Sequence, residues 1–227
     1  MKKSALLSGL LLSVSLSAQA ALYTVNYTPS DGNIPDGNLS GWSDTRTVSG
    51  ITWGNAILNV QVDLNITGGY NGDLYAYLSY GGVLVPLLNR VGVGTGNAFG
   101  YENAGMNITL KDGGAGGDIH WYGGAAVPTG TYAPDGRTIS PLSTPSSFDA
   151  AGTVGFSALN NMSPNGDWTL YFADVSGGGG VSQIGGWSLG FDVVPEPGTW
   201  LSGALLLGLA GAGLGRSLWR KRSQPAV

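Results

Sequence analysis

The sequence predicts an all-β domain between residues 21 and 193, and three observations support this fold class. Apolar and polar residues alternate with a period of two in several segments, which is typical of strands with one buried face. Turn-forming residues separate these segments, and glycine accounts for 40 of the 227 residues. No segment of useful length in this region repeats its apolar residues with the period of a helix. Strands without helices are expected to fold as a sandwich of two sheets.

The clearest strand spans residues 58–66. Asparagine, glutamine and aspartate alternate there with five apolar residues, which are Leu58, Val60, Val62, Leu64 and Ile66. A glycine-rich turn at residues 68–72 leads to a second alternating segment at 73–80. We therefore predict that these two strands are adjacent and antiparallel.

Two further strands are predicted near the end of the domain. Trp168, Leu170 and Phe172 alternate with polar residues, a loop follows at 176–180, and the alternation returns over residues 187–193. Seven tryptophans and ten tyrosines supply a core, and the chain has no cysteine. About 175 residues suffice for one domain that buries roughly 70% of its unfolded surface without disulfides.

Residues 1–20 are predicted to be a secretory signal peptide. Lys2 and Lys3 precede an apolar run, and Ala18 and Ala20 supply the small residues of a cleavage site. The alternative is a retained anchor, but the apolar run covers only about half of the ~20 residues that span a bilayer. We expect cleavage after Ala20.

The C-terminal region combines three elements in order. A linker at 194–198 contains Pro195, Glu196 and Pro197, a predicted transmembrane helix follows at 199–219, and residues 220–227 form a basic cytoplasmic tail. Arg216, Arg220, Lys221 and Arg222 make up the basic cluster. The uncharged run 200–215 covers about 24 Å at 1.5 Å per residue, which is short for a permanent span. A helix buried in a globular core is the alternative.

The placement of charges predicts the topology. All 14 acidic residues lie between Asp31 and Glu196, where only four of the ten basic residues are found, so this stretch has a net charge of −10. The other basic residues flank the two terminal apolar runs, as expected for ends that start in the cytoplasm. We predict that the middle of the chain is exported, and its acidity excludes nucleic acid as a ligand.

The C-terminal elements resemble the PEP-CTERM sorting signal of Gram-negative bacteria that make exopolysaccharide. The resemblance covers about the last 30 residues. It implies that an exosortase, a membrane transpeptidase, cleaves at or near Pro195, Glu196 and Pro197 and so releases the chain from an inner-membrane intermediate to the envelope surface or the extracellular matrix. A chance Pro-Glu-Pro linker before an ordinary anchor is the alternative.

The predicted strands resemble the P domain, or Homo B domain, which follows the protease domain in proprotein convertases and many bacterial subtilisin-like proteases. The matching segments are residues 58–62, 72–74, 85–90, 108–112, 132–136, 165–170 and 186–191. The resemblance covers most of residues 51–193 and implies a jelly roll of the galactose-binding-like type. Residues 21–50 are too few to form the protease domain that precedes the P domain in that family.

Two apparent catalytic signals are weak. The segment Gly186-Trp187-Ser188-Leu189-Gly190 fits the pattern of a nucleophile elbow, but Ser188 is predicted to lie on the solvent side of a strand. The only histidine, His120, precedes that serine and is predicted to lie in a surface loop. We therefore expect that the domain is not an enzyme.

Calcium is the one metal that the sequence suggests. The acidic domain offers hard oxygen ligands, and Asp112, Asp118 and Asp174 fall at strand ends or in loops. Residues 113–118 fit a calcium-binding nonapeptide, although in a single copy where stacked repeats are needed. Solvated loop carboxylates are the alternative.

The sequence therefore favours a non-enzymatic surface or matrix protein whose ectodomain is a binding or structural module. Its expected partners are an exosortase, the membrane and possible ligands such as exopolysaccharide or calcium. Aromatic residues predicted in loops, namely Trp42, Trp53, Trp121 and Tyr122, are candidates for stacking on sugars or for covering a sandwich end. The alternatives are a secreted hydrolase, such as a carboxylate-based glycosidase, and an accessory domain of a surface protease.

Overall fold

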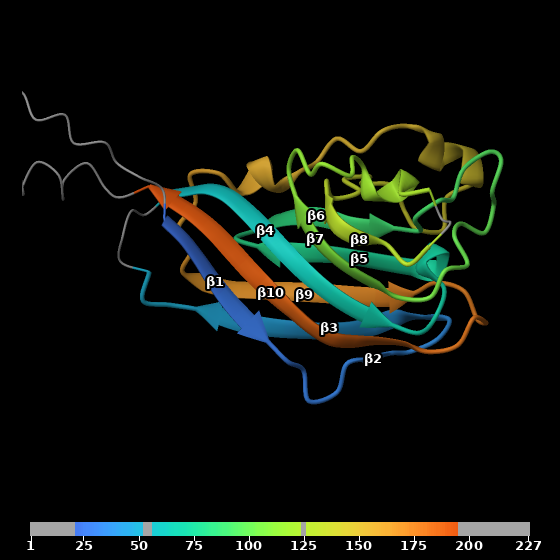
Figure 1. Ribbon diagram of the computed structural model, residues 1–227, viewed down its shortest axis with the longest axis horizontal. Coiled ribbons are helices and arrows are strands. Elements are labelled where there is room, and N and C mark those ends of the chain that lie inside the picture. The colour runs from blue at the N-terminus through green and yellow to red at the C-terminus, as the bar shows by residue number, and fades with distance from the viewer. Residues whose placement is uncertain (1–20, 52–55, 124–125, 195–227) are drawn as a thin grey trace, which may run out of the picture. The chain divides into compact units, whose positions relative to one another are not determined.

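The computed structural model describes residues 21–51, 56–123 and 126–194 (Figure 1). In these residues ten strands form two sheets, joined by loops and four short 3-10 helices, with no α-helix. The strands are β1 Ala21–Tyr27, β2 Asn33–Ile34, β3 Asn38–Val48, β4 Ala56–Thr67, β5 Leu74–Tyr80, β6 Val83–Asn89, β7 Met106–Lys111, β8 Thr129–Tyr132, β9 Gly166–Asp174 and β10 Ser182–Val194. The 3-10 helices are η1 Asn71–Asp73, η2 Ile119–Trp121, η3 Pro145–Asp149 and η4 Phe156–Leu159.

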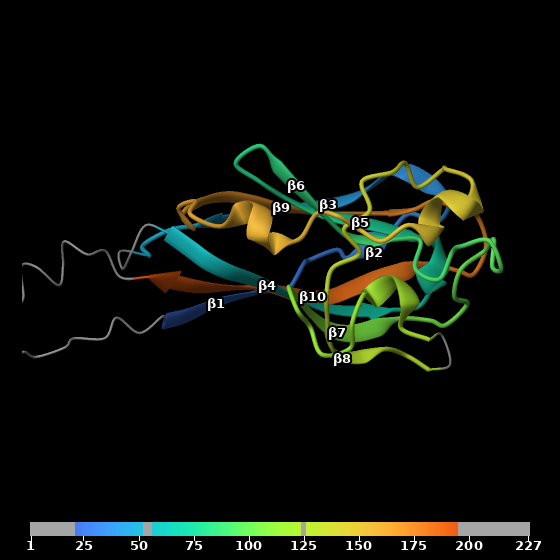
Figure 2. The same cartoon turned by 90° about the horizontal axis from the view of Figure 1, so that it is seen from above.

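The two sheets lie as separate layers, which Figure 2 shows nearly edge-on. One has the order β1-β10-β4-β7-β8, with β2 also paired to β10, and the other has the order β3-β9-β5-β6. Neighbouring strands are antiparallel except β7 and β8, which are parallel. The predicted all-β fold is confirmed, and the two layers are consistent with a sandwich.

The core lies between the sheets and is built by the inward residues of both. Trp168 of β9 stacks on Tyr80 of β5 with the ring centroids 3.9 Å apart, and it also contacts Phe191 of β10 at 5.0 Å. The buried indole N–H of Trp168 donates to the carbonyl of Pro164 at 2.9 Å. This tryptophan therefore joins the two layers without leaving a polar group unpaired.

The period-two pattern correctly predicted the strands β4, β5, β9 and β10. On β4, Val60, Val62 and Leu64 are buried, and on β5 Leu74, Ala76 and Leu78 are buried. The prediction that these two strands are adjacent is wrong. β4 pairs with β10 and β7, whereas β5 pairs with β9 and β6 in the other sheet.

The segment between β4 and β5 explains this error, because it crosses from one sheet to the other. Gly68 and Gly69 have φ of 72° and 59°, a conformation that favours glycine, and η1 follows. The side-chain amide of Asn71 donates to the carbonyl of Gly105 at 2.9 Å, which fixes the crossing. The apolar faces of β4 and β5 therefore meet across the core rather than side by side.

Several predicted segments lie outside the described residues. These are the signal peptide at 1–20, Pro195, Glu196 and Pro197, the transmembrane helix at 199–219, the basic cluster from Arg216 to Arg222, and Trp53. In the part of the chain that is described, no helix is long and apolar enough to span a bilayer.

Candidate functional site

The outward face of the larger sheet is covered mainly by amide and hydroxyl side chains. Because the apolar residues of β4 point into the core, the residues between them point outwards, and the paired strands continue this pattern. We call this surface the polar face. It consists of Leu22, Thr24 and Asn26 on β1, Gly186, Ser188, Gly190 and Asp192 on β10, Asn59, Gln61, Asp63 and Asn65 on β4, Asn107, Thr109 and Lys111 on β7, and Thr129 and Thr131 on β8.

Strand register arranges the polar face in rows that run across the sheet. Each outward residue in the middle of β4 stands between one residue of β10 and one of β7. The three central rows are Gly190–Gln61–Lys111, Ser188–Asp63–Thr109 and Gly186–Asn65–Asn107. Because glycine has no side chain, the third row is open at Gly186, whereas in the first row the side chain of Gln61 lies over Gly190.

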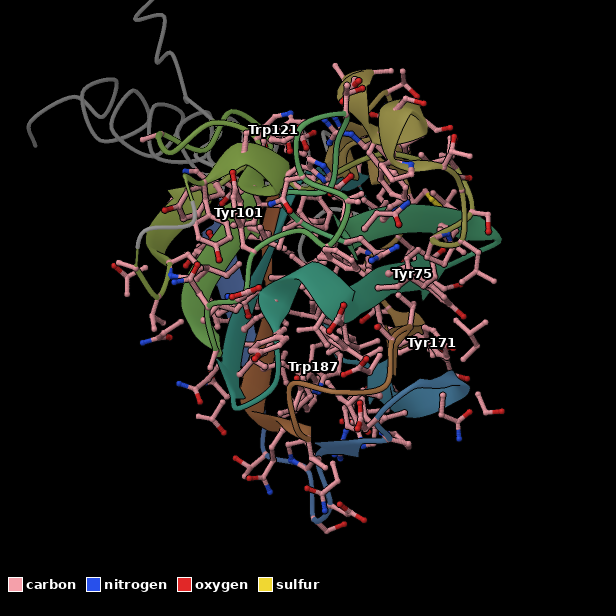
Figure 3. The ribbon with its side chains drawn as sticks, turned by 90° about the vertical axis from the view of Figure 1, so that its right-hand side faces the viewer. Tyr75, Tyr101, Trp121, Tyr171 and Trp187 are labelled. Atoms are coloured by element: carbon pink, nitrogen blue, oxygen red, sulfur yellow. The ribbon has the colours of Figure 1, made fainter. Side chains whose placement is uncertain are left out.

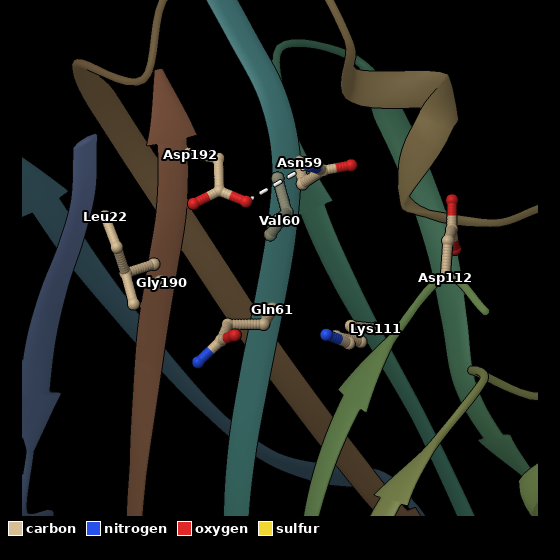
Figure 4. A pocket seen from close by; sticks show the side chains of 8 residues that line it. All are labelled: Leu22, Asn59, Val60, Gln61, Lys111, Asp112, Gly190 and Asp192. Carbon is tan, nitrogen blue, oxygen red and sulfur yellow. Dashed lines mark hydrogen bonds between the residues drawn. The ribbon is translucent and has the colours of Figure 1, made fainter. Parts of the chain in front are cut away.

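Two hollows lie on the polar face, one beside each of these two rows. The hollow at Gly190 has a volume of about 150 Å³, and Figure 4 shows Gln61 and Lys111 beside it. The hollow at Gly186 has a volume of about 260 Å³ and is lined in part by Asn65 and Asn107. Each hollow is bordered by a glycine of β10.

The middle row separates the hollows and is fixed by hydrogen bonds. Asp63 accepts from the hydroxyl of Thr109 at 2.5 Å through Oδ1 and from the hydroxyl of Ser188 at 2.5 Å through Oδ2. At one end of the face, the amide of Asn59 donates to Asp192 at 3.1 Å. The carboxylates of Asp63 and Asp192 therefore already accept hydrogen bonds from neighbouring side chains.

Other groups on the polar face remain available. Among the described residues, the side chains of Gln61, Asn65 and Asn107 have no hydrogen-bond partner. Lys111 has no acidic partner within 4.0 Å in the same part of the chain. The groups that border the hollows can therefore bond to a ligand without breaking existing bonds.

Of the three aspartates predicted to bind calcium, two already have donors on both carboxylate oxygens. Asp112 accepts from the backbone N–H groups of Phe156 and Ser157 at 2.9 and 2.7 Å and so holds the start of η4. Asp118 accepts from the backbone N–H of His120 at 2.9 Å and pairs with Arg137 at 2.9 Å. Both carboxylates have a structural role in the fold.

Asp174 differs because it is fully buried and its Oδ2 has no partner among the described residues. Burial raises the pKa of Asp174 to about 6, the N–H groups of Ser176 and Gly37 oppose this, and the carboxylates of Asp73 and Asp36 reinforce it. Burial also raises the pKa of Asp73, against the effect of Arg90. Within the described ranges, no group of three or more acidic or histidine side chains is placed to hold a metal ion.

The prediction that His120 is a surface residue is wrong, because its side chain is completely buried. Its Nδ1 lies 2.7 Å from Asp135 Oδ2, and its Nε2 donates to the carbonyl of Val93 at 2.8 Å. Asp135 is also buried and contacts Arg137 at 3.1 Å. The glycine-rich context of His120 gave no sign of this, since its partners are distant in sequence.

The apparent nucleophile elbow is part of a strand. Ser188 lies in the middle of β10 and is 3% exposed, and its hydroxyl is bonded to Asp63. Both ring nitrogens of His120 are bonded to other groups, namely Asp135 and Val93. The serine and the histidine thus belong to separate networks. Ser188 points to the outward side of its sheet, as predicted, but it is nearly buried there.

A cluster of tyrosines on the outward face of the smaller sheet was not singled out from the sequence. Tyr77 and Tyr171 are cross-strand partners whose rings stack with centroids 4.6 Å apart and an interplanar angle of 18°. Tyr75 packs against both, and Figure 3 shows Tyr75 and Tyr171 on the same side of the sandwich. The alternation of Tyr75 and Tyr77 was visible in the sequence, but Tyr171 joins them only through the pairing of β5 with β9.

The aromatic residues predicted in loops have different environments. Trp121 is 45% exposed and packs against the guanidinium of Arg137 at 5.8 Å. Tyr122 is half-buried and bonds to Asn71 at 3.1 Å. Trp42 lies in β3 rather than in a loop, and its indole donates to the carbonyl of Asp31 at 2.7 Å. Of the three, Trp121 alone presents a large exposed surface.

Comparisons with known proteins give little further information. No family model matches the chain, and no curated protein matches it. The similar solved structures include the serine protease of Aeromonas sobria in complex with the chaperone ORF2, at 17% identity, and the same protease alone, at 15%. Both have a TM-score of 0.42, and the similarity covers 78% of this chain but only 27% of theirs. A likeness this weak supports no conclusion about fold type or activity.

Proposed function

We propose that the chain is an exported, non-enzymatic protein of the cell surface or exopolysaccharide matrix, sorted by an exosortase through Pro195, Glu196 and Pro197. In this proposal residues 1–20 direct export, the helix at 199–219 holds the chain in the inner membrane, and processing releases it. The β-sandwich then acts as a binding or structural module outside the cell.

The pairing of Ala21 with Val193 is the observation that supports this proposal best. Ala21 is the first residue after the expected signal-peptide cleavage, and Val193 lies two residues before Pro195. The start of β1 and the end of β10 therefore lie together at one end of the sandwich, on the left in Figure 1. Cleavage at either predicted site removes no described strand, so processing is compatible with an intact fold.

The fold type is also part of the proposal. Segments that resemble the P domain fall on strands or at their ends, since residues 72–74 lead into β5, 165–170 into β9, and 186–191 lie in β10. Two facing, mainly antiparallel sheets favour a jelly roll of the galactose-binding-like type.

Of the three predicted calcium ligands, we propose Asp174 as the one that binds the ion, with its other ligands coming from outside the acidic and histidine side chains described. Its buried Oδ2 has no partner in the described part of the chain, and the carboxylates of Asp73 and Asp36 act on its pKa, whereas both oxygens of Asp112 and Asp118 already accept hydrogen bonds. Bound calcium raises the melting temperature by mass action. The increase at millimolar calcium should disappear in Asp174→Asn, and an unchanged parent melting temperature would refute the site.

Sorting is tested by replacing Pro195, Glu196 and Pro197 with alanine in the host cell and following the chain by fractionation and immunoblotting. The variant should cross the inner membrane but accumulate there at its unprocessed size, because neither export nor membrane arrest needs these three side chains. A matched control replaces Thr28, Pro29 and Ser30 with alanine in the loop after β1, and it should be processed like the parent. If the first variant reaches the surface at the parent's mass, the sorting assignment is wrong.

A further inference from the structure

We propose that the polar face binds a neutral polysaccharide, which lies along β10 with sugar hydroxyls in the hollows at Gly186 and Gly190. This inference rests on the proposed function, because it names the ligand class of the exported module. Its residues are neither the sorting residues Pro195, Glu196 and Pro197 nor members of the buried cluster around His120.

The charge of the polar face favours an uncharged partner. The face carries Asp63, Asp192 and Lys111 among sixteen outward residues. Asp112 also lines the hollow at Gly190, and both of its oxygens accept from backbone N–H groups. Asp63 accepts from two hydroxyls and Asp192 from the amide of Asn59, so both carboxylates are already bonded. The face therefore offers neither a basic patch for an anionic polymer nor a free acidic patch for a cationic one.

The free side chains match the hydrogen-bonding groups of sugars. The side-chain amides of Gln61, Asn65 and Asn107 can each donate and accept hydrogen bonds. Sugar hydroxyls also donate and accept hydrogen bonds, so they can pair with these amides in both directions. These three amides have no hydrogen-bond partner among the described residues, so they are hydrated when no ligand is bound. A neutral polyol can thus replace the water bound to these amides without the free-energy cost of removing a charged group from water.

The spacing of the hollows favours a polymer. Gly186 and Gly190 are four residues apart on the same face of one strand, or about 13 Å at 3.3 Å per residue. The bonded row of Ser188, Asp63 and Thr109 stands between them and cannot turn away without losing its hydrogen bonds. A ligand that fills both hollows must therefore be longer than one sugar ring.

The tyrosine cluster on the other sheet is less suited to sugars. Carbohydrate stacking needs an exposed aromatic face. Tyr77 and Tyr171 stack on one another, and Tyr75 packs against both, so these rings cover one another's faces. The hydroxyl of Tyr171 is also bonded to the carbonyl of Leu39.

The test is native affinity electrophoresis of the full chain in a polyoxyethylene detergent, which has no sugar headgroup. Gels contain neutral glucans, mannans or galactomannans, or anionic alginate at the same concentration. We expect at least one neutral polymer to slow the chain and alginate to slow it less.

Gly186→Gln fills one hollow, because a Cβ at this position meets only the Tyr27 carbonyl oxygen at 3.5 Å. It should raise the apparent dissociation constant about tenfold or more, equivalent to about 1.4 kcal/mol. Gly190→Ser should weaken binding too, since its Cβ displaces the flexible Gln61 side chain. Gly177→Gln is the matched control in an open loop position with nothing within 4 Å, and it should bind like the parent.

Equal mobility of the parent in neutral and polymer-free gels would overturn the inference, as would retardation by alginate alone. Retardation of the parent that survives in both hollow variants, with parent-like circular dichroism melting, would also overturn it. Fractionation of the same parent protein separates this failure from failure of the proposed function. A chain that is processed and reaches the surface without binding glycan leaves the sorting proposal standing.

Discussion

The hydroxyl of Ser188 donates to Oδ2 of Asp63 at 2.5 Å, and this bond crosses from β10 to β4 on the polar face. Asp63 uses its other oxygen for Thr109 on β7, so one carboxylate links three strands. The serine that resembles a nucleophile in the sequence is thus part of a hydrogen-bonded row. This row also divides the two hollows.

Asp63→Ala is expected to lower the free energy of unfolding by about 1–3 kcal/mol, because it leaves the nearly buried hydroxyl of Ser188 without its acceptor. Ser188→Ala should cost about 1 kcal/mol, and the double variant should cost less than the sum of the two. Urea denaturation of an Ala21–Val194 protein, which contains all ten described strands, measures the three values. Strictly additive effects would show that the two side chains are not coupled.

Arg137→Met is expected to be strongly destabilising, by about 3–5 kcal/mol, because it removes the cation that faces the buried carboxylate of Asp135 and the partly buried one of Asp118. Arg46→Met is the matched control. Arg46 also pairs with an aspartate, Asp44, at 2.8 Å, but its side chain is 36% exposed, so the loss should stay below about 1 kcal/mol. If the two variants lose similar amounts of unfolding free energy in the same denaturation assay, burial does not determine how much each arginine contributes.

Asp174→Asn is expected to change how stability depends on pH. The pKa of Asp174 is raised from 3.8 to about 6 in the folded state, so the folded protein holds this proton more tightly than the unfolded chain. The protonated Asp174 side chain therefore makes its full contribution to the free energy of unfolding below about pH 4, and this contribution is lost as the pH rises through 6. The two proteins should differ least below about pH 4, and at pH 8 the unfolding free energy of the variant should exceed that of the parent by on the order of 1–2 kcal/mol.

Calcium-free denaturation curves from about pH 3.5 to 8 measure this difference. The raised pKa of Asp73 acts in the same direction, and because its carboxylate interacts with that of Asp174, part of its contribution also changes in the variant. A constant difference between variant and parent across this range would show that Asp174 does not titrate there.

Local patterns predicted the strands well, but they could not predict which strands pair. Alternation in β4 and β5 shows which residues are buried and not where the hydrogen-bonded neighbour lies. β10 pairs with β4 although more than 100 residues separate them, and the segment around Asn71 carries the chain to the other sheet. The same dependence on distant partners hid the burial of His120, whose ring contacts Val93 and Asp135.

The candidate site was only partly predictable for a related reason. The small residues Gly186, Ser188 and Gly190 alternate in the sequence and indicate an outward face with little bulk. Their role depends on the register that sets Gly190 beside Gln61 and Gly186 beside Asn65. Without that register, the same residues fit the pattern of a nucleophile elbow.

The most direct measurement of the central proposal is mass spectrometry of the chain isolated from the cell surface or matrix of the native host. Signal-peptide cleavage and sorting predict a mature protein that begins at Ala21 and ends at or near Pro195, without the basic cluster from Arg216 to Arg222. This product would retain β1 and β10 and hence the pairing of Ala21 with Val193. A chain found only in the inner membrane, with an intact C-terminus at Val227, would contradict the proposal.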